Sequence, residues 1–92
     1  MTAHVIVTLT VIDSAKLKQY SAAAGPTVAK FGGEFVGRGP LAVLHGETDQ
    51  QVQVIIQFPT REDADNWYQS PEYQALIALR SEAMDALFTV IG

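Results

Sequence analysis

The chain has 92 residues, of which 48% are hydrophobic and 17% are charged, and its formal net charge is -4. This length predicts a single domain, 1–92, because two domains would need a longer chain. Nucleic acids and anionic membranes are excluded as expected partners, since six basic residues are outnumbered by ten acidic ones and such partners need clustered Lys and Arg. The chain contains no cysteine, which excludes disulfides, thiolate nucleophiles and cysteine-based zinc sites.

The apolar content is high for so small a domain. A chain of this size hides only about 60–65% of the surface that it exposes when unfolded. We therefore expect a second apolar face that a second copy of the chain covers, which predicts a homodimer. The N-terminal residues lack the basic start of a signal peptide, and the apolar run after them is too short to span a membrane. We expect a cytoplasmic protein.

The first predicted strand runs from His4 to Ile12, because β-branched residues dominate it. Both of its faces carry apolar residues, which indicates a central strand covered on both sides. A helix then begins at Asp13 or Ser14, which can cap it. Apolar residues recur at helical spacing from there to Phe31, Gly25-Pro26 predicts a kink or a restart, and Gly32-Gly33 predicts the end of the helix.

The next segment, 34–45, is predicted as one strand that is interrupted by a bulge. Glu34 to Arg38 favours a strand, glycines and Pro40 disturb it, and Leu41 to His45 resumes it. Residues 46–49 have the composition of a turn. A further strand is predicted from Val52 to Phe58, with alternating apolar residues on one face.

Two capping signals follow the third strand. Thr60 with Asp63 predicts a helix that continues through Tyr68, and Ser70-Pro71 predicts a second helix that runs to about Ala83. Residues 87–91 predict the last strand. With the two segments after the third strand counted as one helical region, the order βαββαβ predicts an α+β domain with an antiparallel sheet and the helices on one sheet face.

Several of these segments resemble one family. The matching residues are Phe58-Pro59, Trp67-Tyr68, Ser70-Pro71-Glu72-Tyr73-Gln74 and Leu79-Arg80, together with Pro26, Gly32-Gly33 and Arg38-Gly39. In register from Val5 to Ile91, the chain is similar to the family called domain of unknown function 1330. It departs from the family pattern at Pro40, where a second glycine is common, and at His45, where Glu is common.

The resemblance implies a ferredoxin-like fold of the dimeric α/β-barrel superfamily, in which two sheets pair. Relatives include cofactor-independent monooxygenases and muconolactone isomerases. In such relatives a pocket lies between the sheet and the helices of each subunit. The resemblance therefore implies a small-molecule ligand and no cofactor.

Three residues are candidates for catalysis. Arg38 could hold a carboxylate or an enolate by paired hydrogen bonds, or it could be an ordinary surface arginine. His45 could transfer a proton near neutral pH, or it could be an exposed histidine beside a turn. Tyr73 lies on the same predicted helix face as Arg80, where a phenol next to a cation could polarise a ligand oxygen. Its alternative role is to anchor the helix.

The predicted ligand-binding residues are Arg38, Trp67, Tyr68, Tyr73 and Arg80. Trp67 and Tyr68 are neighbours on a helix and must point in different directions, so one could fill the core while the other meets a ligand. Arg80 could instead form an ion pair between helices, and Tyr20 is interpreted as core packing. Two histidines without ligand spacing predict no metal site.

Three functions remain open at this point. The first is an enzyme without cofactor that transfers protons or adds oxygen to a small aromatic or enolic molecule. The second is a module that binds a small ligand, or serves in stress, without turnover. The third is a dimeric interaction module whose predicted pocket is simply core.

Overall fold

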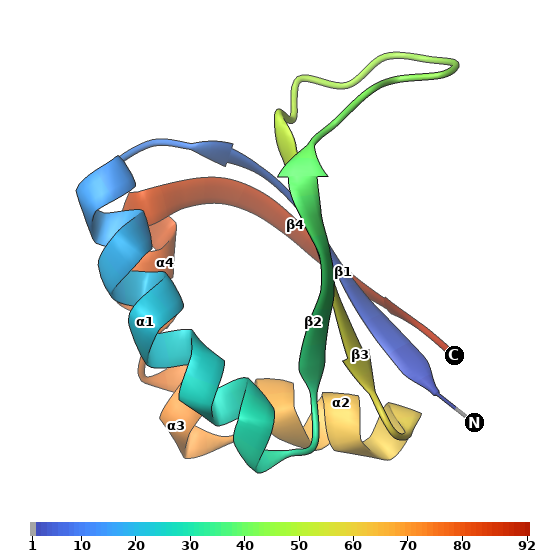
Figure 1. The fold of residues 1–92 in the computed structure, drawn as a ribbon. Helices are drawn as coiled ribbons and strands as arrows, with labels where there is room; N and C mark the ends of the chain where they lie inside the picture. The colour runs from blue at the N-terminus through green and yellow to red at the C-terminus, as the bar shows by residue number, and fades with distance from the viewer. Residues whose placement is uncertain (1) are drawn as a thin grey trace.

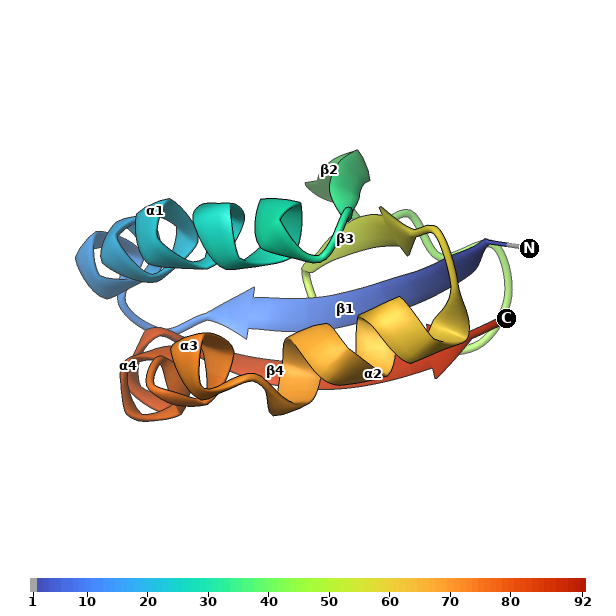
Figure 2. The same cartoon turned by 90° about the horizontal axis from the view of Figure 1, so that it is seen from below.

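The computed structural model describes residues 2–92 and shows one curved antiparallel sheet with helices on one side of it (Figures 1 and 2). Four strands are hydrogen bonded in the order β2-β3-β1-β4. The elements are β1 (Ala3–Val11), α1 (Ser14–Lys30), β2 (Glu34–Pro40), β3 (Val52–Phe58), α2 (Arg61–Gln69), α3 (Pro71–Gln74), α4 (Ile77–Ala83) and β4 (Met84–Ile91). The predicted α+β, ferredoxin-like arrangement is confirmed.

The central strand β1 divides the sheet into a core face and an open face. It pairs antiparallel with β3 on one side and with β4 on the other. Val5, Val7 and Leu9 are at most 5% exposed and face the helices, whereas alternate residues such as Ile6 and Thr8 lie on the opposite face. No helix within residues 2–92 covers that open face, and Figure 1 shows α1 to α4 on the other side of the sheet.

Helix α1 has the predicted ends but not the predicted interruption. The side chain of Asp13 accepts a hydrogen bond from the backbone N–H of Lys16 at 3.1 Å, and Gly32 ends the helix with a φ of 79°. The helix runs through Pro26 as one element. Of the two predicted alternatives, a kink or a restart, the restart is therefore wrong. Pro26 is exposed, and its ring costs the helix one backbone hydrogen bond and crowds the carbonyl four residues earlier, but the helix does not end there.

Both predicted caps of the second helical region are confirmed. The side chain of Thr60 accepts from the N–H of Asp63 at 3.0 Å, and that of Ser70 accepts from the N–H of Tyr73 at 3.2 Å. The predicted single helix up to Ala83 is wrong, because α3 ends at Gln74 and α4 begins at Ile77. Between them the N–H of Leu76 bonds to the carbonyl of Tyr73, three residues back, and this tighter turn breaks the helical register.

Strand β2 is shorter than predicted. The predicted bulge is confirmed by a register shift between Phe35 and Gly37, but the continuation over 41–45 is wrong. Strand β3 starts at Val52, opposite Pro40, so residues beyond Pro40 have no strand to pair with. A single backbone bond, from Leu41 to Gln51, closes the base of the 41–51 segment. This segment projects away from the domain on the side opposite α1 (Figure 1).

Within residues 2–92, no helix has both the length and the apolar character needed to cross a membrane.

Candidate functional site

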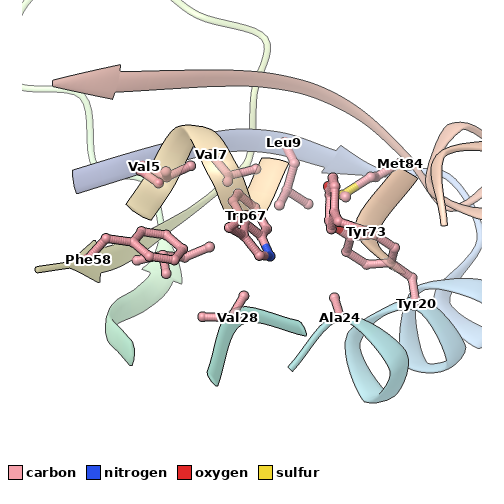
Figure 3. Close-up of a cluster of buried hydrophobic side chains, with 12 residues drawn as sticks. Val5, Val7, Leu9, Tyr20, Ala24, Val28, Phe58, Trp67, Tyr73 and Met84 are labelled. Carbon is pink, nitrogen blue, oxygen red and sulfur yellow. The ribbon is translucent and has the colours of Figure 1, made fainter. Parts of the chain in front are cut away.

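Three large aromatic side chains from β3, α2 and α3 are fully buried in the core (Figure 3). Trp67, Tyr73 and Phe58 are each at most 1% exposed. The Trp67 ring lies 4.4 Å from the Tyr73 ring and 5.4 Å from the Phe58 ring, centroid to centroid. The indole N–H of Trp67 donates to the hydroxyl of Thr27 at 3.0 Å, which ties α2 to α1. Trp67 is therefore a fixed wall of the core.

Three tyrosines and one arginine form a hydrogen-bonded group beside this wall. We call Tyr20, Tyr68, Tyr73 and Arg80 the tyrosine–arginine cluster. The Tyr20 and Tyr73 hydroxyls are 2.6 Å apart. One guanidinium nitrogen of Arg80, Nη1, donates to Tyr73 at 3.0 Å and to Tyr68 at 3.1 Å. The guanidinium also lies 4.6 Å from the centroid of the Phe88 ring, a cation–π distance.

The cluster holds a cation without a carboxylate partner. The ion pairs found within residues 2–92 involve Lys16, Lys30 and Arg61. The alternative reading of Arg80 as an inter-helix ion pair is therefore wrong. Aromatic faces and phenol oxygens surround the charge instead, which leaves its positive field uncompensated within the cluster.

Burial sets the protonation of the two central tyrosines. Burial raises the pKa of Tyr20, and the nearby Tyr73 raises it further. Burial also raises the pKa of Tyr73, although its hydrogen bonding with Tyr20 and with Arg80 offsets part of that rise. Burial lowers the pKa of Arg80, but its bonds to Tyr73 and Tyr68 raise that pKa above its ordinary value overall. At neutral pH the phenols are therefore hydrogen-bond donors, and the arginine is a cation.

A pocket of about 420 Å³ opens between the core face of the sheet and α1. Most of the lining residues are aliphatic or aromatic, and those with a polar atom in the side chain are Tyr20, Ser21, Arg38 and Trp67. The apolar wall residues include Val7, Leu9, Val28, Val54, Met84 and Phe88. Arg38 is the one charged residue in this lining. It reaches the pocket from β2, directly opposite Val54 of β3, and stacks 5.5 Å from the centroid of the Phe35 ring.

A second pocket of about 260 Å³ lies between α2 and β4. Trp67 and Phe88 contribute to both pockets, while Tyr68 and Asp65 line only this one. The two pockets therefore share an aromatic partition.

The structure separates the three candidate catalytic residues. Arg38 lines the larger pocket, whereas Tyr73 is fully buried behind its wall and lines neither pocket. His45 is exposed in the 41–51 segment, outside both linings. The larger pocket is therefore lined by no histidine and no carboxylate among residues 2–92, so no side chain there is a ready proton acceptor at neutral pH.

The predicted ligand-binding residues are likewise divided. Arg38 and Trp67 line the larger pocket and Tyr68 the smaller one, while Arg80 acts through the phenols that it contacts. Sequence reasoning missed Tyr20, which lines the larger pocket. A hydroxyl on the core face of a helix must find a hydrogen-bond partner, and this requirement could have linked Tyr20 to the second buried phenol.

The comparisons with other proteins concern both sequence and fold. A family model described as "Domain of unknown function (DUF1330)" matches residues 2–92. The comparison with curated proteins returned no match.

Three solved structures illustrate the likeness in fold. The RPA0582 protein of Rhodopseudomonas palustris, of unknown function, is 17% identical, with a TM-score of 0.80 over 98% of this chain and 80% of that one. A dimeric ferredoxin-like protein of unknown function from Jannaschia sp. CCS1 is 13% identical, with a TM-score of 0.73 over 100% and 99%. SnoaB of Streptomyces nogalater, a cofactor-independent oxygenase, is 13% identical, with a TM-score of 0.72 over 99% and 91%. At these identities, the likeness shows the fold.

Proposed function

The chain belongs to the DUF1330 family, whose description assigns no reaction, and we propose from its pocket that it binds a small, largely apolar molecule carrying an oxygen anion. One observation carries this proposal: a pocket of about 420 Å³ has apolar walls and a single charged residue, Arg38. Ligand sites typically have this character, with a few polar groups that orient the ligand in an apolar cleft of roughly 300–1,000 Å³. The pocket suits a molecule with one or two rings.

Arg38 gives the site its polarity. A guanidinium presents two parallel N–H donors that match a carboxylate or an enolate oxygen. The ring of Phe35 stacks on this guanidinium in a cation–π contact. The ligand we propose therefore places its rings against the sheet and its anionic oxygen toward β2.

We further propose that the protein works as a homodimer paired through the open face of the sheet. On that face Leu87 and Ile91 of β4 are 58% and 56% exposed, and Ile6 and Ile55 lie between them and β2 in register. Solved structures of similar fold are described as dimeric.

We also propose that the protein works in the cytoplasm. The absence of cysteine suits this reducing compartment.

A second candidate function, oxygenation of the bound molecule without a cofactor, has one observation in its favour. SnoaB, which has a similar fold, is a cofactor-independent oxygenase. Because no histidine or carboxylate of the described residues lines the larger pocket, a substrate converted here would have to be acidic enough to enter as its own anion, with Arg38 stabilising the charge. Binding alone requires no such acidity.

Isothermal titration calorimetry with 1-naphthoate tests the binding proposal. Arg38→Ala should weaken binding about tenfold, the loss expected for an exposed charge-assisted hydrogen bond. Arg61→Ala is the matched control, because Arg61 is an exposed arginine whose side chain pairs with Asp65 and lines neither pocket. Unchanged affinity in Arg38→Ala, or an equal loss in Arg61→Ala, would contradict the assignment.

Native mass spectrometry of the protein purified from its own host then separates the two functions. A dimer carrying a small molecule of the proposed class supports the binding role. Oxygen consumption with 1,4-dihydroxy-2-naphthoate, an acidic hydroxyaromatic, tests turnover. Consumption that disappears in Arg38→Ala would favour the oxygenase.

Sedimentation velocity tests the dimer. Leu87→Glu should shift the protein to a monomer at micromolar concentration, because a charge would have to be buried between the sheets. Asp85→Asn, on the same strand and face, is the control that should remain a dimer. A wild-type monomer under the same conditions would refute the pairing.

A further inference from the structure

Within the tyrosine–arginine cluster, the Tyr20–Tyr73 pair has one hydroxyl proton that its mutual hydrogen bond does not use. Arg80 donates to the oxygen of Tyr73, and Tyr73 shares one hydrogen bond with Tyr20. Each of the two phenols carries one proton, and their mutual bond uses only one of them. The second proton has no acceptor among the hydrogen bonds found for residues 2–92. Both phenol oxygens still have a hydrogen-bond partner, as do all buried side-chain nitrogen and oxygen atoms of these residues.

The surroundings of the two phenols decide which one carries the spare proton. Tyr73 is fully buried and lines neither pocket, so a spare proton on Tyr73 would be left without any acceptor. An unmade hydrogen bond of this kind costs about 1–3 kcal/mol. Tyr20 is 8% exposed and lines the larger pocket, so a spare proton on Tyr20 can meet water or a ligand there.

The charge of Arg80 favours the same direction. A phenol oxygen that accepts a bond from a guanidinium becomes a better donor through its own O–H, because hydrogen bonds in a chain polarise one another. Tyr73 therefore donates to Tyr20, and Tyr20 in turn becomes a better donor. The chain runs from Arg80 through Tyr73 to Tyr20 and ends at the larger pocket.

We propose that Tyr20 is a ligand-binding residue whose hydroxyl donates, under polarisation by Arg80 through Tyr73, to a carbonyl or anionic oxygen of the molecule in the larger pocket. This proposal rests on the proposed function, because it needs a molecule in that pocket. It adds a second polar contact, from α1, to the one that Arg38 makes from β2. Tyr73 is a positioning residue, since it touches Tyr20 and not the ligand.

Two neutral probes of nearly equal shape isolate the contact. 1-Tetralone carries a carbonyl oxygen, whereas tetralin has a methylene group in its place. Neither carries the charge that Arg38 would bind. Calorimetric titration of the wild type with both probes, at a pH between 6 and 8, keeps both phenols protonated.

Tyr20→Phe should weaken binding of 1-tetralone about 3- to 10-fold, the effect of one neutral hydrogen bond, and leave binding of tetralin unchanged. The infrared carbonyl stretch of bound 1-tetralone gives a second readout that packing alone would not move. It should lie at lower frequency in the wild type, shift back fully in Tyr20→Phe and shift back partly in Tyr73→Phe. Circular dichroism and sedimentation confirm that both variants fold.

Two results would overturn the role of Tyr20 while leaving the pocket as a binding site. One is an equal loss of affinity for both probes in Tyr20→Phe. The other is a carbonyl stretch whose frequency is the same in the wild type and in both variants. If neither probe binds to the wild type in the pocket, the proposed function itself fails, and the donor role of Tyr20 fails with it.

Discussion

The tyrosine–arginine cluster and the edge formed by β2 with residues 41–51 differ in almost every physical respect. The residues of the cluster come from α1, α2, α3 and α4, and their polar groups bond to one another. The edge is exposed: Phe35 is 44% accessible and Leu44 is 99% accessible. Each region nevertheless contributes one polar residue, Tyr20 or Arg38, to the larger pocket.

This contrast assigns different tasks to the two sides of the pocket. On the enclosed side, the position of each polar atom is fixed by packing, so a donor there can be aimed before any ligand arrives. On the edge, Arg38 is held only by its strand and by Phe35, so it can adjust to the ligand. Substitutions in the cluster should therefore change stability, and substitutions at the edge should change binding.

The largest expected effect separates the regions by stability. Trp67→Ala should lower the free energy of unfolding by about 3–5 kcal/mol, because it removes a fully buried ring from the core. Phe35→Ala, at the exposed edge, should cost no more than about 1 kcal/mol. Guanidinium denaturation followed by circular dichroism measures both. Similar losses would show that the edge is packed as tightly as the aromatic wall.

High pH should weaken the cluster in particular. Since folding raises the pKa of Tyr20 and Tyr73, the folded protein keeps both protons at pH values where the unfolded chain loses them. Their stabilising effect is complete below pH about 10 and is lost as the pH rises toward the folded pKa, by up to about 1.4 kcal/mol per pH unit for each tyrosine.

Urea denaturation between pH 8 and 11 measures this loss. The double variant Tyr20→Phe with Tyr73→Phe should show a shallower fall in unfolding free energy above pH 10 than the wild type. The same slope in both proteins would contradict the account of the cluster.

The two arginines provide a matched test of the contrast. Arg80→Ala should cost about 1–3 kcal/mol of unfolding free energy, because Tyr73 and Tyr68 lose the charged donor that they share. Arg38→Ala should stay within about 0.5 kcal/mol, as exposed substitutions do. Thermal and chemical denaturation compare them, and a larger loss for Arg38→Ala would reverse the roles given to the two residues.

The smallest expected effect concerns His45. It is exposed and lies outside both pockets, so His45→Ala should change neither the unfolding free energy nor the affinity for 1-naphthoate beyond experimental error. Calorimetry with the variant measures the affinity. A clear loss would mean that the 41–51 segment reaches a binding site.

Local signals in the sequence predict most of the fold. Alternation in β1 and β3 and the caps at Asp13, Thr60 and Ser70 each depend on residues close together in the chain. One predicted element is wrong where the structure depends on residues that are distant in the chain. Residues 41–45 have the composition of a strand, but β3 offers nothing opposite them. The break between α3 and α4 is a tighter turn, in which the N–H of Leu76 bonds to the carbonyl of Tyr73, and the apolar spacing of the sequence continues across it.

The candidate site was predictable only in part. Arg38 and Trp67 were identified by residue type and family motif, and both line the larger pocket. Tyr20 was interpreted as packing, because its partner Tyr73 lies 53 positions away in the chain. The position of His45 could not be predicted, because its segment leaves the sheet after Pro40. Strand alternation therefore does not say which way its side chain points.

The most direct test of the central claim is to locate a bound probe by nuclear magnetic resonance. Intermolecular nuclear Overhauser effects from 1-naphthoate to methyl groups of the protein report which face of the sheet it touches. We predict contacts with the methyl groups of Val7, Val28 and Val54 in the larger pocket. Contacts confined to Leu87 and Ile91 on the open face would contradict the account, because the ligand would then occupy the surface that we assign to the second subunit.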